Sequence, residues 1–380
     1  MTTTVSLDRL RELAGFRARN GCAISLYLDL DPSTTPTAAD TATRVNSLLD
    51  AASKSHGATR GDLAHEVREG LKGDFERVGR YFEAEFDRDG SRGLALFAAG
   101  LDNVWSVLPL PWSVPDQARV ANDFLLAPLV PLLGRGQGAL VALVNREQGR
   151  VFALRNGRLE EIADRTKEAP SKHDQGGWSQ SRFQRHIENV AHEHYKSVAD
   201  ELELQFRRLE RPRIVIVCTD EVRPEVTQAL STEVEEAVIG WASAEQHAGA
   251  AVLLDATLPI IEEWRARNQT ELVGRWREAT GRNSRGVAGW ADTLEAASDG
   301  RVETLLYAAG VSRDAFWCPA CGRASAQAVT CPLDGTTMEP RDDGLDLAVR
   351  LTLSHGGEVC AIEFSRDLDP VEGIGAVLRF

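Results

Sequence analysis

The sequence predicts an α/β protein with mixed sheets and more than one domain. At roughly 150 residues per domain, a chain of 380 residues corresponds to two to three domains, each large enough to bury its own core. Apolar residues make up 43% of the chain and charged residues 26%. These ordinary globular values exclude a disordered or fibrous chain. Helical and strand-like patterns alternate along the whole length, which is typical of the α/β class.

The first section, residues 1–132, combines helices with strands. Apolar residues recur at three-residue spacing from Leu7 to Phe16, which predicts an amphipathic helix. The run 23–28 is rich in strand-favouring residues and is followed by turn residues, so a strand is expected there. Further helices are expected at 41–53 and through 75–82, and further strands at 93–97 and 104–107.

The middle section, residues 133–254, opens with a β-meander over 138–162, because strand-like runs are separated there by polar turns. A long helix is expected from about Gln180 to Arg208. The apolar run 213–218 predicts a buried strand. Helical sequence is expected at 224–237 and a strand at 250–254.

The last section, residues 255–380, opens with a long helix that carries Trp264, Leu272 and Trp276. Strands are expected at 346–353 and 359–364. A cysteine-bearing insertion at 316–338 interrupts this section. The expected organisation is therefore three α/β sections, the last with a small insertion.

Charge and hydropathy limit the partners. The chain has 43 basic and 57 acidic residues, so contact with RNA has to be local rather than global. The longest apolar stretch, Phe124 to Leu133, contains two prolines and is far shorter than the ~18 to 20 residues that span a membrane. The first residues are amphipathic and charged, and six cysteines are too few for a secreted disulfide framework. A cytoplasmic protein without a membrane partner is expected.

The most informative segment runs from Pro170 to Phe183 and precedes the long helix. From Arg165 to His186 there are five basic residues against two acidic ones, whereas Glu188 to Glu210 has three basic and six acidic residues. Positive charge is therefore confined to this tip, which suits contact with RNA. The alternative is an ordinary solvated helix end.

The motifs of this segment resemble a known family. Lys172-His173, Gly176-Gly177 and Arg182-Phe183 hold, without a gap, the positions of the Lys-His, Gly-Gly-Gln and Ser-x-x-Arg-Phe motifs in the middle domain of archaeo-eukaryotic peptide chain release factors and Pelota. The likeness extends over nearly the whole chain, at 24–28, 44–46, 302–306 and 373–380. It implies a three-domain, tRNA-mimicking architecture, with a decoding-site-like domain at 1–132, the Gly-Gly loop domain at 133–254 and a GTPase- or ribosome-docking domain at 255–380.

Two departures restrict what the resemblance implies. The release factors carry a catalytic glutamine after the two glycines, and this sequence has Trp178 there. The stop-codon motif before Arg44 is replaced by residues 40–43, which lack its lysine and asparagine. Stop-codon decoding is therefore not expected. An exposed Trp178 can stack on an unpaired base of ribosomal RNA, and the alternative is that it folds onto its own domain.

A glutamine survives two positions later, as Gln180, and matches the Gly-x-x-Gln pattern of a divergent branch that rescues stalled ribosomes. Gln180 is therefore a candidate catalytic residue, because an amide on a glycine-rich loop can orient water and stabilise an oxyanion. The alternative is that Gln180 caps the helix or faces solvent. The candidate residues for binding ribosomal RNA are Lys172, His173, Gly176, Gly177, Trp178, Arg182 and Arg185.

The insertion has the spacing of a zinc knuckle. Cys318-Pro-Ala-Cys321-Gly places two thiolates on one turn, and Cys331-Pro-Leu-Asp334-Gly repeats the pattern with aspartate in place of the fourth cysteine. Structural zinc on Cys318, Cys321, Cys331 and Asp334 is expected. His355 or Cys360 is an alternative fourth ligand, and a metal-free knuckle is the other alternative.

The resemblance implies a factor that occupies the A site of the 70S ribosome, between 23S and 16S rRNA. The first hypothesis is a non-catalytic ribosome hibernation factor. The second is a codon-independent peptidyl-tRNA hydrolase that uses Gln180. A nuclease-like role is weaker, because no acidic metal triad supports it. In the family the last domain docks on a translational GTPase, so elongation factor Tu or a relative is an expected partner.

Overall fold

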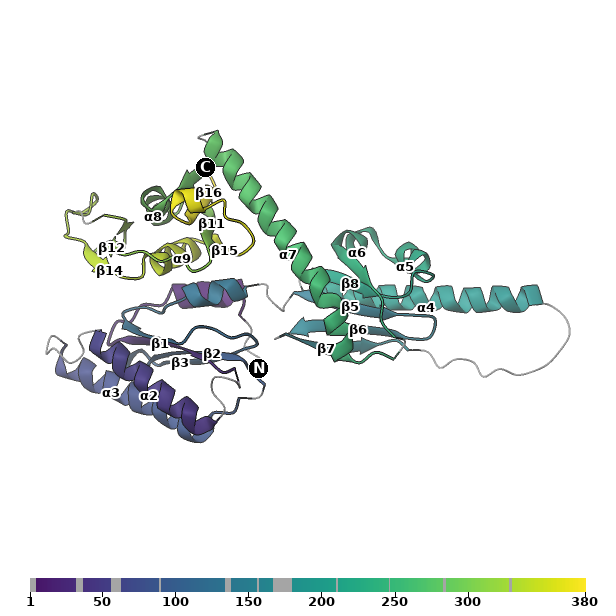
Figure 1. Cartoon of the computed structure of the whole chain (residues 1–380), viewed down its shortest axis with the longest axis horizontal. Coiled ribbons are helices and arrows are strands. Elements are labelled where there is room, and N and C mark those ends of the chain that lie inside the picture. The colour runs from purple at the N-terminus through teal and green to yellow at the C-terminus, as the bar shows by residue number, and fades with distance from the viewer. Residues whose placement is uncertain are drawn as a thin grey trace. The chain divides into compact units, whose positions relative to one another are not determined.

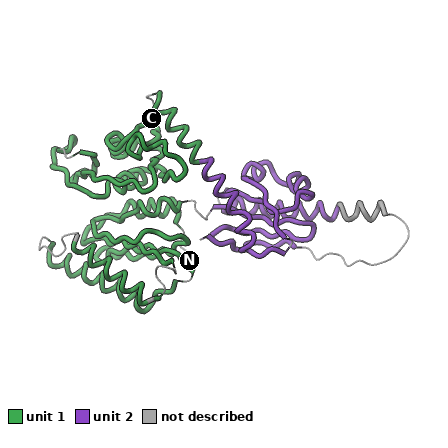
Figure 2. Tube along the Cα trace, in the orientation of Figure 1, with its two compact units in different colours: residues 1–133, 269–380 green, residues 134–268 purple. Residues whose placement is uncertain are grey.

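The computed structural model describes residues 5–31, 37–55, 63–88, 90–133, 138–155, 157–166, 180–209, 211–245, 247–282, 285–327 and 330–380, with the backbone alone for 38, 55 and 180–188. The chain groups into two compact units (Figure 2). Unit 1 consists of residues 1–133 and 269–380, and unit 2 consists of residues 134–268. The α/β class with mixed sheets is confirmed, while the division into three domains stays a prediction.

The N-terminal part of unit 1 is an antiparallel sheet with the strand order β3-β2-β1-β4. Its elements are α1 (Leu7–Ala14), β1 (Ala23–Asp29), α2 (Ala38–Ser55), α3 (His65–Arg80), β2 (Gly93–Ala99), β3 (Val104–Leu110) and β4 (Gln117–Ala121). Helices α2 and α3 cover one face of the sheet (Figure 1). The predicted helices and strands of this part are confirmed, and β4 is an addition to them.

Strand β1 is buried on both faces. Ile24, Leu26 and Leu28 pack against α2 and α3, while Tyr27 packs on the opposite face. That second face shares one hydrophobic core with α1 and with residues of the C-terminal part of unit 1. Double burial explains why β1 reads as a continuous apolar run rather than an alternating one.

The C-terminal part of unit 1 contains a second sheet of order β10-β16-β11-β15, in which β11 and β15 are parallel. A small sheet of order β13-β12-β14 carries the cysteine insertion. The elements of this part are β10 (Gly286–Ala288), α8 (Trp290–Ser298), β11 (Val302–Ala308), β12 (Ala315–Trp317), β13 (Ala324–Ser325), β14 (Glu339–Arg341), α9 (Gly344–Ser354), β15 (Glu358–Ile362) and β16 (Ile374–Leu378).

Unit 2 is built on a five-stranded mixed sheet of order β7-β6-β5-β8-β9, with β5, β8 and β9 parallel. Its elements are β5 (Ala139–Val144), β6 (Gly149–Arg155), β7 (Arg158–Asp164), α4 (Gln180–Arg208), β8 (Arg213–Val217), α5 (Arg223–Ala229), α6 (Thr232–Ala237), β9 (Val238–Ala242) and the first part of α7 (Ala250–Gly281). Helices α4, α5 and α6 cover one face, and α7 covers the other (Figure 1). The predicted meander and long helix are confirmed.

Two expected strands are wrong. Residues 250–254 form the first turns of α7, where Thr257 donates a hydrogen bond to the Leu253 carbonyl as a helical residue does. Residues 346–353 belong to α9. Leucine and valine alternate there in a strand-like way, but Ala348 and Thr352 are buried as well, so the buried set follows helical spacing. The predicted boundary at 254/255 also lies inside α7.

Within the part of the chain that the structure covers, no helix is both long and apolar enough to cross a membrane.

Candidate functional site

The structure places only the helical part of the predicted RNA-contacting segment. Gln180, Arg182 and Arg185 lie in the first two turns of α4, which begins at Gln180 as predicted. The remaining predicted residues of this segment lie outside the described residues: Lys172, His173, Gly176, Gly177 and Trp178. What the structure describes is therefore how the helix that follows the Gly-Gly motif is held on its sheet.

One face of α4 packs on the sheet of unit 2. Tyr195, Val198, Leu202 and Phe206 are buried at helical spacing against β5, β6 and β8. Gly149, at the start of β6, lies directly under this face, and a β-carbon there would overlap with Cγ2 of Val198. The glycine therefore permits a close approach of helix to strand that any other residue would obstruct.

An ion pair with a buried carboxylate joins the end of β7 to the same face of α4. The guanidinium of Arg165 donates to Oε2 of Glu201 over 2.5 Å, and the backbone N–H of Arg165 donates to the Gly149 carbonyl over 2.6 Å. Glu201 is only 6% exposed, and its other oxygen accepts a hydrogen bond of 2.8 Å from Gln205. Both carboxylate oxygens are satisfied, as burial of a charge requires.

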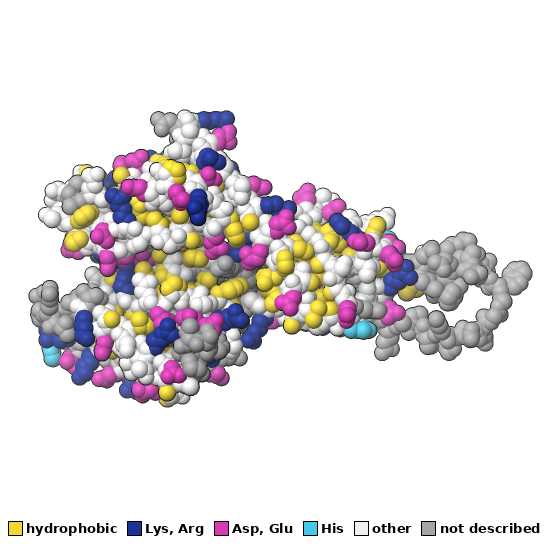
Figure 3. Space-filling view, in the orientation of Figure 1, with side chains coloured by type: hydrophobic (Ala, Val, Ile, Leu, Met, Phe, Trp, Pro, Cys, Tyr) yellow, Lys and Arg dark blue, Asp and Glu magenta, His cyan; other side chains and the backbone are white. Residues whose placement is uncertain are grey.

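Basic and acidic side chains alternate over the visible surface of both units (Figure 3). In the sequence, Arg165 belongs to the basic segment 165–186 and Glu201 to the acidic segment 188–210. Glu201 lies three residues after Val198 on the buried stripe of α4, and an acid on an apolar stripe is a signal for a buried partner.

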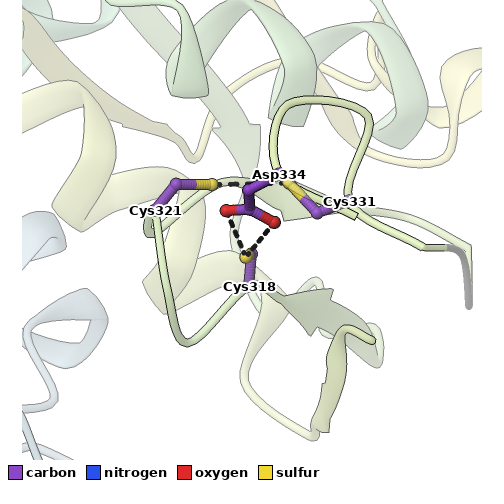
Figure 4. A group of neighbouring side chains, drawn as sticks. All are labelled: Cys318, Cys321, Cys331 and Asp334. Carbon is purple, nitrogen blue, oxygen red and sulfur yellow. Dashed lines mark hydrogen bonds between the residues drawn. The ribbon is translucent and has the colours of Figure 1, made fainter. Parts of the chain in front are cut away.

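The predicted knuckle is a cluster in unit 1, where Cys318, Cys321, Cys331 and Asp334 converge from two turns (Figure 4). The turns repeat one geometry. Gly322 N–H donates to the Cys318 carbonyl and Gly335 N–H donates to the Cys331 carbonyl, each over 2.9 Å. The two glycines have φ values of 80° and 74°, a left-handed conformation that favours glycine. Asp334 therefore occupies the position that a second cysteine holds in the first turn.

The four ligand atoms have the spacing of a small coordination shell. They all lie within 4.8 Å of one another, with 3.4 Å between the sulfurs of Cys321 and Cys331. The sulfur of Cys318 lies 3.5 and 3.6 Å from the carboxylate oxygens of Asp334. Tetrahedral zinc with bonds of about 2.3 Å has ligand separations of about 3.8 Å. The cluster can therefore hold a metal ion.

Local hydrogen bonds separate the pKa values of these groups. The backbone N–H and hydroxyl of Thr336 hold the pKa of Asp334 well below its usual range. Burial raises the pKa of Cys318, but the backbone N–H groups of Cys321 and Ala320 lower it by more, so the pKa lies below its ordinary value. The Arg323 N–H lowers the pKa of Cys321, yet desolvation and the neighbouring ligands raise it to about 12. A bound cation would favour the thiolate at all three cysteines.

The alternative fourth ligands lie elsewhere. Cys360 is on β15 and packs in the hydrophobic core of that sheet. Nδ1 of His355 lies 2.8 Å from the Leu351 carbonyl, one turn earlier at the end of α9. Among the described residues, the group that converges is the one with Asp334. The structure thus brings Asp334, and neither His355 nor Cys360, into the group with the three cysteines.

Comparison with known proteins adds the family. Residues 125–262 match the model of the bacterial archaeo-eukaryotic release factor family 10. Peptide chain release factor subunit 1 of Thermococcus onnurineus is 23% identical, with 98% of this chain and 96% of that protein aligned. The Archaeoglobus fulgidus protein of the same name is 25% identical over the same shares.

A ribosome-bound archaeal Pelota, solved with ABCE1, is 12% identical, with 76% of this chain and 77% of that chain covered and a TM-score of 0.44. The sequence matches extend over nearly the whole chain and agree with the motifs at 172–183. Residues 125–262 therefore match a bacterial family of archaeo-eukaryotic release factors, and nearly the whole chain is similar in sequence to archaeal peptide chain release factors.

Proposed function

We propose that this chain is a ribosome-binding translation factor that occupies the A site of the 70S ribosome and acts as a hibernation factor without decoding stop codons. The observation that carries the proposal is the combination in one segment of sequence of retained Lys172-His173, Gly176-Gly177 and Arg182-Phe183 with Trp178 in place of the release-factor glutamine. The motifs for reaching the large subunit remain, while the residue for hydrolysis is gone. Residues 40–43 similarly lack the codon-reading side chains.

The residue types of this segment suit occupancy of the A site. Two glycines let a backbone approach RNA closely, and the indole of Trp178 offers a face on which a base of 23S rRNA can stack. Lys172, Arg182 and Arg185 can neutralise phosphates. Contact with 16S rRNA is proposed for residues 1–132, which the resemblance identifies as the decoding-site-like domain. The factor acts in the cytoplasm, where ribosomes are.

Sedimentation tests this proposal. Tagged protein is centrifuged with ribosomes from growing and from starved cells, and density maps of the bound particles follow. The expected result is co-sedimentation with vacant 70S particles, with the protein in the A site. Failure of the purified protein to join 70S particles at micromolar concentration would refute the proposal.

A peptidyl-tRNA hydrolase is the second candidate, and the observation that favours it is Gln180 in a Gly-x-x-Gln pattern. An amide at the first residue of α4 can orient water and stabilise the oxyanion that forms at the ester carbonyl. The Gln180→Ala variant separates the two functions. If the chain is a hydrolase, release of peptide from stalled ribosomes is lost in this variant while 70S affinity stays the same. If it is a hibernation factor, the wild type releases no peptide.

The proposed protein partner is a translational GTPase, with elongation factor Tu first. It is assigned to residues 255–380 because the resembled family docks GTPases through its last domain. Pull-down with elongation factor Tu, loaded with GTP or GDP, tests this assignment. Retention of the factor by the full chain supports the assignment, and absence of retention with both nucleotides contradicts it.

The proposed cofactor is one structural zinc ion at the Cys318, Cys321, Cys331 and Asp334 cluster. Three thiolates and a carboxylate at tetrahedral spacing are a donor set that suits zinc. When bound, the ion would hold the two turns together. Four protein ligands fill the four positions of a tetrahedral shell, as in a structural site; Cys318 and Cys331 are buried, whereas Cys321 and Asp334 are exposed.

A further inference from the structure

We propose that Arg165 and Glu201 are positioning residues that aim the first turns of α4, and with them Gln180, Arg182 and Arg185, at ribosomal RNA. This inference rests on the proposed ribosome binding. Its structural basis is the ion pair between the end of β7 and the middle of α4. Neither residue needs to touch the ribosome for the pair to act.

The carboxylate of the pair is buried, whereas the Arg165 side chain is half-exposed. The side chain of Glu201 is 5% exposed and holds Arg165 and Gln205 on its two oxygens. The backbone N–H of Arg165 donates a hydrogen bond to Gly149 at the start of β6, and Val198 packs on the same residue. Beside Gly149 the helix is thus joined to the sheet by packing at Val198 and by charge at Glu201, in addition to the packing of Tyr195, Leu202 and Phe206.

Helix geometry turns this junction into a pivot. Glu201 lies 21 residues after Gln180, so about 31 Å of helix separates the two. A tilt of about 5° at the pivot moves the start of α4 by about 3 Å. Hydrogen bonds tolerate about 0.5 Å of variation in length, so such a tilt breaks contacts at the tip. Loss of the pair therefore weakens RNA contacts that it does not itself make.

The direction in which Glu201→Gln changes the affinity for RNA distinguishes a positioning role from a direct electrostatic one. Glu201→Gln removes a negative charge, so a direct effect on binding to RNA phosphates would be tighter binding. Positioning predicts the reverse, weaker binding. Glu203→Gln is the matched control, because Glu203 lies on the same helix in a partly exposed pair with Arg207 and the charge change is identical.

The experiment compares these variants in free and ribosome-bound protein. Genetically encoded nitroxide side chains at Arg158 on β7 and Asn189 on α4, both exposed, report the distance distribution between strand and helix in the full chain. We expect Glu201→Gln and Arg165→Ala to broaden or shift this distribution, whereas Glu203→Gln and Arg165→Lys leave it as in the wild type. Thermal unfolding confirms that each variant is folded.

The second measurement is affinity for vacant 70S ribosomes at several salt concentrations. Glu201→Gln should weaken binding about tenfold and reduce the salt dependence, because fewer phosphates are contacted. An unchanged distance distribution overturns the inference whether or not ribosomes are bound. A changed distribution with wild-type affinity overturns the positioning role. A changed distribution in a chain whose wild type ignores ribosomes contradicts the proposed function and leaves the mechanical role of the pair established.

Discussion

Asp123 and Arg350 form a buried ion pair between the two segments of chain that make up unit 1. Arg119 and Arg341 also contact the Asp123 carboxylate, at 2.5 and 3.2 Å. The Asp123 side chain is 6% exposed, and Arg119 in turn pairs with Asp343. Asp123 thus forms buried ion pairs with Arg341 and Arg350, which lie more than two hundred positions away in the sequence. This cluster joins the N-terminal and C-terminal segments in a way that apolar packing alone would not specify.

Asp123→Asn should destabilise unit 1 by about 3 to 5 kcal/mol, because it removes the carboxylate that neutralises Arg350. Arg119 and Arg341 lose one of their partners and keep Asp343. Urea unfolding of the full chain measures the change. Asp8→Asn is the control, since Asp8 is exposed and pairs with Arg11 on the same helix, so its loss should cost less than about 1 kcal/mol. Equal effects of the two substitutions would contradict the role of the cluster.

Acid should weaken the same cluster. Burial raises the pKa of Asp123, but Arg350, Arg119 and Arg341 outweigh it and hold the pKa below its ordinary value. A depressed carboxyl pKa stabilises the fold above the unfolded pKa of about 3.9, and this stability is lost as pH falls through the folded value. Stability of the wild type should therefore be level near neutral pH and fall below about pH 4. The slope should be smaller in Asp123→Asn, as titration of urea midpoints between pH 3 and 7 would show.

Gly149→Ala should destabilise unit 2 by about 1 to 3 kcal/mol, because the new methyl group overlaps with Val198 of α4. Gly274→Ala is the matched control. Gly274 lies inside α7, and a β-carbon there would meet no atom beyond its own helix within 4 Å, so alanine should stabilise the helix by about 0.5 to 1 kcal/mol. Thermal unfolding distinguishes the two. Adding Val198→Ala to Gly149→Ala should recover part of the lost stability, and further loss would mean that the overlap is not the cause.

The fold was largely predictable because most elements bury one consistent face. Helix α4 carries periodic apolar residues and strand β1 a run of strand-favouring ones, and both form where the sequence predicts them. The alternating apolar residues of 346–353 predict a strand, but this segment forms helix α9. Because small residues such as Ala348 can be buried in either a strand or a helix, the packing of the segment decides between the two. The convergence of Cys318 and Asp334 was predictable because spacing alone builds the two turns.

The ion pairs were not predictable in the same way. Arg165 and Glu201 are separated by 36 residues, and Asp123 and Arg350 by 227. No local pattern assigns such partners, because the choice among many arginines and carboxylates is made by the packing of distant elements. Sequence can show that Glu201 sits on a buried stripe, but it cannot name the cation that neutralises it.

Metal analysis should find one zinc ion per chain in protein purified without chelator, and Asp334→Ala should lose it or bind it far more weakly. Asp334→Cys should bind zinc more tightly than the wild type, because it completes four thiolates on the same turns. A chelator should lower the unfolding temperature of the wild type and leave that of Cys331→Ser nearly unchanged. Mass spectrometry of the native protein gives the metal content. Zinc retained in full by both Asp334→Ala and Cys331→Ser would contradict this ligand set.

Binding to 70S ribosomes should weaken with salt, and the start of α4 should set part of that dependence. Replacing Arg182 and Arg185 together by alanine should reduce the slope of log affinity against log salt by about 1 to 2, one phosphate contact for each arginine. The matched control replaces Arg207 and Arg208, at the other end of α4, with the same change in net charge. Its slope should equal that of the wild type, because the contact is local and not a response to total charge. Equal slopes for both double variants would mean that the basic residues after the Gly-Gly motif do not reach the RNA.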